Sequence, residues 1–64
     1  MNESPVELLA QAAAALRNEQ WADHVELADR ILAHARLSPS MRAELRRARQ
    51  ASAAMARFLE SVGA

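Results

Sequence analysis

One helix-forming stretch, residues 21–37, has apolar or weakly polar side chains on two sides, and it limits the fold more than any other part of the chain. Both stripes follow the three- and four-residue steps of an α-helix. The first consists of Trp21, Val25, Ala28, Leu32 and Ala35, and the second of His24, Leu27, Ile31 and His34. A helix that is apolar over so much of its circumference needs neighbours on more than one side. We therefore expect this stretch to be the middle element of a small all-α unit.

The length of the chain limits how large a core it can bury. Its 64 residues are enough for one domain, which at this size is often marginally stable by itself. The absence of cysteine excludes disulfides and thiolate metal sites. Helix packing or association with a partner therefore has to supply the stability.

The balance of charges and the absence of long apolar runs indicate in which part of the cell we expect the protein. All eight basic residues are Arg, they equal the acidic residues in number, and alanine is abundant, which is typical of GC-rich coding. No run of 18 apolar residues occurs, so we expect no membrane span. The N-terminus is acidic and lacks a signal-peptide pattern, so we expect a cytoplasmic location.

Two Ser-Pro pairs mark helix starts. Ser4 precedes Pro5, and Glu7 is placed to complete a capping box, while Ser38 and Pro39 repeat the device. We expect helices at residues 5–18, 20–36 and 39–61, with Gly63 as the last C-terminal cap. The polar residues 17–20 favour a break there. No Gly or Pro lies between Val6 and Ser38, however, so a continuous helix over residues 5–36, in a long two-helix antiparallel hairpin, is the alternative.

The first and third helices each carry an apolar pattern. In the first we expect an apolar stripe with a flank beside it: the stripe is Val6, Leu9, Ala13 and Leu16, and the flank is Leu8, Ala12 and Ala15. The third has an apolar seam that alternates steps of four and three: Met41, Leu45, Ala48, Ser52, Met55, Leu59 and Val62. Phe58 lies beside this seam. Either the chain's own helices or a second chain can fill it.

Groups that could perform chemistry do not converge. His24 and His34 are ten residues apart, about 15 Å along one helix, so they cannot bind one metal ion. We expect each at the edge of the core or on the surface. No nucleophile–histidine–acid spacing, glycine-rich phosphate loop or zinc-binding helix motif is present. We therefore predict a protein that is not an enzyme and has no cofactor or metal.

An arginine cluster in the third helix suggests a second kind of function. On a helical wheel Arg42, Arg46, Arg49 and Arg57 share the side turned away from the apolar seam. A basic stripe of this kind can meet phosphate, so a small nucleic-acid-associated regulator using Arg42, Arg46 and Arg49 is an alternative. The neutral net charge and the lack of interleaved aromatic residues disfavour it.

Residues 8–32 carry the pattern of a helical hairpin. Trp21 follows the turn between helices, small or apolar residues follow at Val25, Ala28, Ile31 and Leu32, and Pro39 opens the next helix. This pattern resembles one tetratricopeptide-type helical hairpin. Ala12 stands where that family has a small residue. The chain departs from the pattern at His24, where Ala is usual, at Glu19, where Gly is usual, and in a link to Pro39 about three residues too long. The resemblance implies a protein-binding module, and one repeat cannot bury its faces alone.

The function predicted from these patterns is a helical protein–protein interaction module. It would self-associate as a homo-oligomer, or bind or chaperone a partner helix, through apolar helix faces. Small helical subunits and chaperones of bacterial secretion systems share this size and style, so an adaptor or chaperone of the bacterial cytoplasm is expected. The predicted partner-binding residues are Trp21, Met41, Leu45, Arg46, Met55, Phe58 and Leu59.

Overall fold

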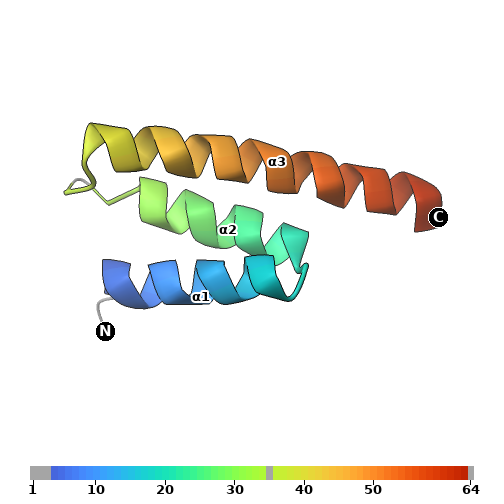
Figure 1. Ribbon diagram of the computed structural model, residues 1–64, viewed down its shortest axis with the longest axis horizontal. Coiled ribbons are helices and arrows are strands. Elements are labelled where there is room, and N and C mark those ends of the chain that lie inside the picture. The colour runs from blue at the N-terminus through green and yellow to red at the C-terminus, as the bar shows by residue number, and fades with distance from the viewer. Residues whose placement is uncertain (1–3, 35, 64) are drawn as a thin grey trace.

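The computed structural model is a three-helix protein, described for residues 4–34 and 36–63. Helix α1 spans Pro5–Arg17, α2 spans Trp21–Leu32 and α3 spans Pro39–Gly63 (Figure 1). The small all-α fold is thus confirmed. A turn separates α1 from α2, so the alternative of one continuous helix over residues 5–36 is wrong.

The turn between α1 and α2 is a Schellman motif. The N–H of Glu19 donates to the carbonyl of Leu16, and the N–H of Gln20 donates to the carbonyl of Ala15, at 3.2 and 2.8 Å. These two bonds satisfy carbonyls that the end of a helix otherwise leaves unpaired. Glu19 adopts a φ of 55°, the left-handed conformation for which glycine is the usual choice. The polar cluster therefore ends α1 at the cost of a strained backbone at Glu19.

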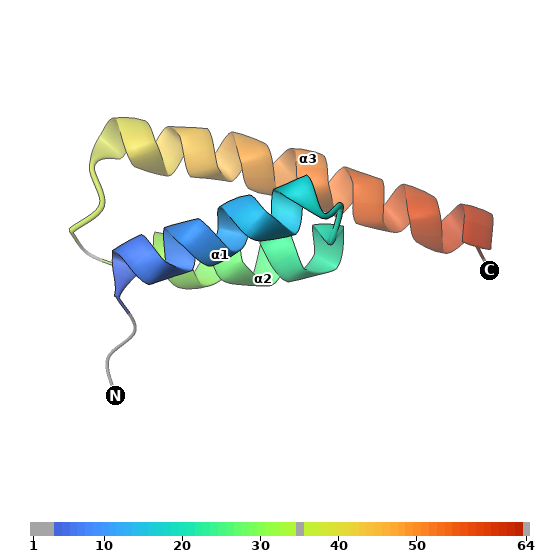
Figure 2. The same cartoon turned by 60° about the horizontal axis from the view of Figure 1, so that its bottom comes forward.

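Helix α2 lies between the other two helices, as its two apolar stripes predict (Figure 1). In the turned view of Figure 2, α1 lies in front of α2. Both α1 and α3 pack against it, whereas no Cα atom of α1 comes within 8 Å of one in α3 among the described residues. The buried apolar cluster joins all three helices through Leu8, Ala12, Ala28, Ile31 and Leu45. The core is therefore a thin layer centred on α2.

Helix α1 packs on α2 through the flank of its apolar stripe. The stripe is largely exposed, including Val6 and Leu16, while the residues of the flank are buried: Leu8, Ala12 and Ala15. The two buried alanines explain the choice, because small side chains allow α2 to approach α1 closely while Leu8 fills the remaining space. The smaller side chains of the flank therefore form the packing face of this helix.

Helix α2 ends four residues earlier than the predicted position 36. The guanidinium of Arg42, in the first turn of α3, donates to the carbonyl of Leu32 at 2.7 Å and to that of His34 at 3.0 Å. Carbonyls bound in this way no longer need further helical N–H donors. His34 therefore lies in the connection rather than in the helix, and Ala35, expected on the first stripe, lies outside the described residues.

The predicted caps have different outcomes. Ser38 caps α3, because its Oγ accepts a hydrogen bond from the N–H of Met41 at 3.2 Å. Ser4 occupies the N-cap position of α1 with extended backbone angles but makes no side-chain bond there, so the capping box with Glu7 is not formed. Gly63 is the last residue of α3 and has no positive φ, so the predicted C-terminal cap is also wrong.

Candidate protein-interaction surface

Helix α3 is about twice as long as the helix against which it packs. It has 25 residues and α2 has 12, so its C-terminal part continues past the start of α2 (Figure 1). We call residues 55–63 the α3 extension. It exposes four large apolar side chains: Met55, Phe58, Leu59 and Val62. Phe58 is 59% exposed and Val62 66%, which is unusual for neighbouring large apolar residues in a domain this small.

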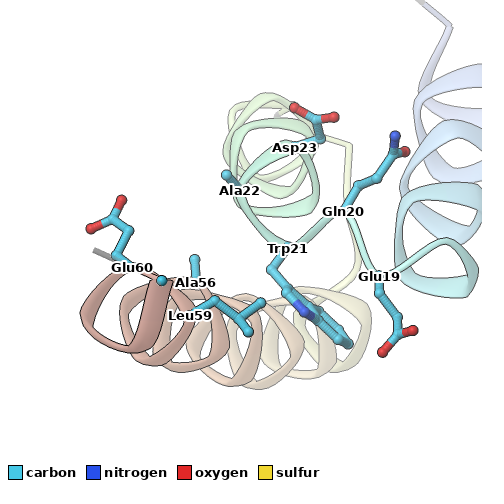
Figure 3. A pocket seen from close by; sticks show the side chains of 9 residues that line it. Glu19, Gln20, Trp21, Ala22, Asp23, Ala56, Leu59 and Glu60 are labelled. Atoms are coloured by element: carbon cyan, nitrogen blue, oxygen red, sulfur yellow. The ribbon is translucent and has the colours of Figure 1, made fainter.

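A groove lies where the α3 extension passes the start of α2. Its volume is about 570 Å³, and its apolar floor is formed by Trp21, Ala22, Ala56, Leu59 and Gly63. Figure 3 shows the indole of Trp21 reaching from the start of α2 over α3, beside Leu59. We call this feature the Trp21 groove. Such a volume accommodates a few side chains of a partner.

The rim of the Trp21 groove is acidic. Glu19 from the turn, Asp23 from α2 and Glu60 from α3 line it, and no basic residue among those described does. None of these three carboxylates forms an ion pair with a described residue. The last turn of α3 has no basic side chain, so the negative end of its helix dipole is not offset there. The positive start of α2 opposes this field, but Asp23 in its first turn offsets that contribution.

The structure divides the predicted partner-binding residues into separate groups. Trp21 and Leu59 meet in the groove, and Met55 and Phe58 lie beside it on the α3 extension. Met41 is exposed, but it lies 18 residues from Leu59, about 27 Å along the helix axis. The expected single seam is therefore interrupted.

The apolar seam of α3 is interrupted because the middle of this helix packs on α2. Leu45 is only 8% exposed and belongs to the core, so it is not available to a partner. Ser52, on the same seam, is also buried. Arg46 is exposed but lies away from the groove. Of the two ways to fill the seam, the chain's own helices fill its centre and leave its ends open.

Two arginines of the predicted basic face point at α2 instead of away from the seam. Arg42 binds the carbonyls at the end of α2, and Arg49 forms an ion pair with Asp29 of α2, with Nε 2.5 Å from Oδ1. The hydrogen bond and the charge of Asp29 raise the pKa of Arg49. The predicted shared face was wrong because α2 docks on the side of α3 that both arginines border. Arg47 pairs with Glu44 within α3, and Arg46 stays exposed.

The only buried polar side chains in the described residues are His24 and Ser52, which form a pair across the α2–α3 interface. The Oγ of Ser52 lies 2.7 Å from Nδ1 of His24, and the two side chains are 1% and 2% exposed. Burial lowers the pKa of His24, which favours the neutral ring at pH 7. A hydroxyl beside an imidazole can be an activated nucleophile, but a covered pair cannot meet a substrate. We interpret it as a polar link within the core, and His24 is deeper than its expected place at the core edge.

Other charged groups of α2 lie close to partners within the helix and across to α3. Arg30 and Glu26 lie 4.0 Å apart one turn along α2. Asp29 instead reaches across to α3. Among the described residues, no three His, Cys, Asp or Glu side chains cluster closely enough to hold a metal ion.

Four residues that line the Trp21 groove were not predicted from the sequence. No sequence spacing connects these residues, because their proximity depends on how α2 and α3 are aligned: Glu19, Asp23, Ala56 and Glu60. One signal was present: the predicted third helix was longer than the second. An overhanging helix places its last residues beside the start of its neighbour.

Comparison with protein-family models, with curated proteins and with solved structures gives no match to this chain. In the part of the chain that the structure describes, no helix combines the length and the hydropathy that crossing a membrane requires.

Proposed function

We propose that this protein is a non-enzymatic interaction module that binds a partner helix, or a second copy of itself, through the α3 extension and the Trp21 groove. The exposed apolar cluster on the α3 extension carries this proposal. Single exposed apolar residues are ordinary on protein surfaces, whereas adjacent ones next to a groove are typical of interaction sites. Four large apolar side chains within two helical turns meet that description.

The spacing of the cluster supports a helix-on-helix mode of binding. Met55, Phe58, Leu59 and Val62 stand at positions i, i+3, i+4 and i+7, which place them on one face of α3. Helices bind one another through anchors at these steps. Trp21 at the edge of the cluster is of the residue type most common among binding hot spots, and Met55 adapts to different partners. The resemblance to a tetratricopeptide-type hairpin also favours protein binding.

The nucleic-acid alternative has less support. Of the three arginines it requires, Arg42 and Arg49 are engaged with α2, which leaves Arg46. One of the three proposed phosphate contacts, on a chain without net charge, provides little attraction for a phosphate backbone. We therefore propose an adaptor or chaperone role in a bacterial cytoplasm, based on the small size, the helical style and the arginine- and alanine-rich composition.

The proposal is tested by changing the apolar cluster without touching the core. The variant Phe58→Asp places a charge on an exposed site of α3, and Gln50→Asp, also exposed on α3, is its matched control. Self-association is measured by sedimentation velocity, and binding of synthetic amphipathic helices is measured through the fluorescence of Trp21, the only tryptophan. We expect Phe58→Asp to weaken the interaction at least tenfold, with an unchanged circular dichroism spectrum. A wild-type chain that neither self-associates nor binds any helix would refute the proposal.

A further inference from the structure

We propose that the Trp21 groove takes a segment of another protein that inserts an apolar side chain and carries Lys or Arg on either side of it. This inference rests on the proposed function and specifies the chemistry of its partner. The groove provides both parts of the match, an apolar floor and an acidic rim.

The floor selects an apolar side chain. Ala22, Ala56 and Gly63 are small, so they leave open the space beside Trp21 and Leu59. A side chain of the size of Leu or Phe that enters this space meets an apolar lining that includes Trp21 and Leu59, which lie side by side in Figure 3. Burying it removes apolar surface of both partners from water, which favours association.

The rim selects positive charge around that side chain. Three carboxylates come from three separate parts of the fold, at Glu19, Asp23 and Glu60, and none of them is neutralised by an ion pair with a described residue. The indole of Trp21 is also the best aromatic partner for a cation at close range. A partner with acidic residues in these positions would meet repulsion on every side.

A second copy of this chain fits the groove poorly. In a two-fold dimer each residue of an interface faces its symmetry-related surroundings, so pairing groove with groove brings six carboxylates together. Like charges placed together across an interface disfavour a partner. The chain also has no net positive charge with which to offset them. The charge of the rim therefore favours a foreign, basic segment over self-association.

The experiment uses three synthetic helical peptides without tryptophan. The first has a central Leu flanked by Lys one turn before and after it, the second replaces each Lys with Glu, and the third keeps Lys but replaces Leu with Ser. Each is titrated into the full chain while the emission of Trp21 is recorded. We expect a saturable blue shift with the first peptide, binding at least tenfold weaker with the other two, and weakening as salt rises from about 0.05 M to about 0.5 M.

Variants of the rim supply the matched comparison. Glu60→Gln and Asp23→Asn should each weaken binding of the basic peptide about two- to fivefold, the range expected for exposed charge pairs. Glu7→Gln, an exposed carboxylate on α1 away from the groove, should leave the affinity unchanged. Leu59→Ser tests the floor, and it should abolish the blue shift while the helix content is retained, because this side chain is half-exposed.

The outcomes separate this inference from the proposed function. Equal binding of the Lys and Glu peptides would overturn the basic partner but keep the apolar interaction. A chain that dimerises, with a dimer broken by Phe58→Asp and no peptide bound, would also overturn it and identify the occupant as a second copy. Failure of every peptide together with a strictly monomeric chain would overturn both proposals.

Discussion

From the hydrogen bond between Ser52 and His24 we predict how much the free energy of unfolding changes when this bond is removed. Replacing Ser52 with Ala removes one partner of a 2.7 Å contact and leaves Nδ1 of a ring that is only 2% exposed without a partner. Leaving a buried polar atom unsatisfied costs about 1–3 kcal/mol. Alanine is the better helix former by roughly 0.5 kcal/mol, which offsets part of this loss. We therefore expect the free energy of unfolding to fall by about 1–2 kcal/mol.

That loss is large for a chain of this size. Domains have about 0.05–0.15 kcal/mol of stability per residue, which gives roughly 3–10 kcal/mol for 64 residues. In small domains 1 kcal/mol shifts the melting temperature by about 4–8 °C, so we expect a decrease of roughly 5–15 °C. Thermal and urea melts followed by far-UV circular dichroism measure it. They should be recorded at about pH 8, above the ordinary histidine pKa, where the His24 ring is neutral.

A matched serine and a double variant test the reasoning. Ser61→Ala removes an exposed hydroxyl that bonds only the Phe58 carbonyl of its own helix, so stability should change by less than about 0.5 kcal/mol. The double variant Ser52→Ala with His24→Leu removes both polar partners, and it should recover most of the stability lost in the single variant. If Ser52→Ala behaved like Ser61→Ala, the bond would not be contributing to the core, and the interpretation of this pair would be wrong.

Three further predictions concern pH, the turn and the end of α2. Burial lowers the pKa of His24, so below the ordinary value of about 6.5 the unfolded chain binds a proton more readily than the folded protein. The contribution of the neutral His24 ring to the free energy of unfolding is thus complete above that pH. It declines by up to about 1.4 kcal/mol per pH unit as the pH falls towards the folded-state pKa. Urea unfolding midpoints measured from about pH 8 to about pH 5 should show this decline, and the variant His24→Leu should lack it. Glu19→Gly relieves a φ of 55° and should raise the urea-derived unfolding free energy by about 0.5–1 kcal/mol, whereas an equal gain in Glu19→Ala would argue against strain. Arg42→Met removes two hydrogen bonds to the end of α2 and should lower the free energy of unfolding by about 1–2 kcal/mol. Arg46→Met, its exposed control, should change the free energy of unfolding by less than about 0.5 kcal/mol. Similar losses in both variants would contradict the capping role of Arg42.

The sequence was sufficient to predict the helices because the signals that define them are local. The pair Ser38-Pro39 starts α3, polar residues end α1, and the double stripe of residues 21–37 indicates a helix with neighbours on two sides. Each of these depends on residues within a few positions of one another. The end of α2 could not be predicted, because Arg42 in the following helix provides the donors for its last carbonyls.

Faces and contacts were harder to predict because they depend on how helices align. The apolar pattern of α1 has a stripe and a flank, and it does not decide between them; the flank with two alanines is buried because it permits closer packing. The contact between His24 and Ser52 joins residues 28 positions apart, and no spacing rule connects them. The candidate site was predicted in part: Trp21, Phe58 and Leu59 carried visible patterns, whereas the acidic rim did not.

The arrangement of the three helices also has a consequence for how the chain folds. Each interhelical packing joins helices that follow one another in the chain, and the backbones of α1 and α3 do not approach. Contacts between neighbouring segments close short loops, and helical proteins dominated by such contacts fold in microseconds to milliseconds. Helix α2 is required by both interfaces, so hydrogen exchange should be slowest in α2. The residues of α1 and of the α3 extension should exchange sooner, since each can detach while the rest of the molecule keeps its contacts.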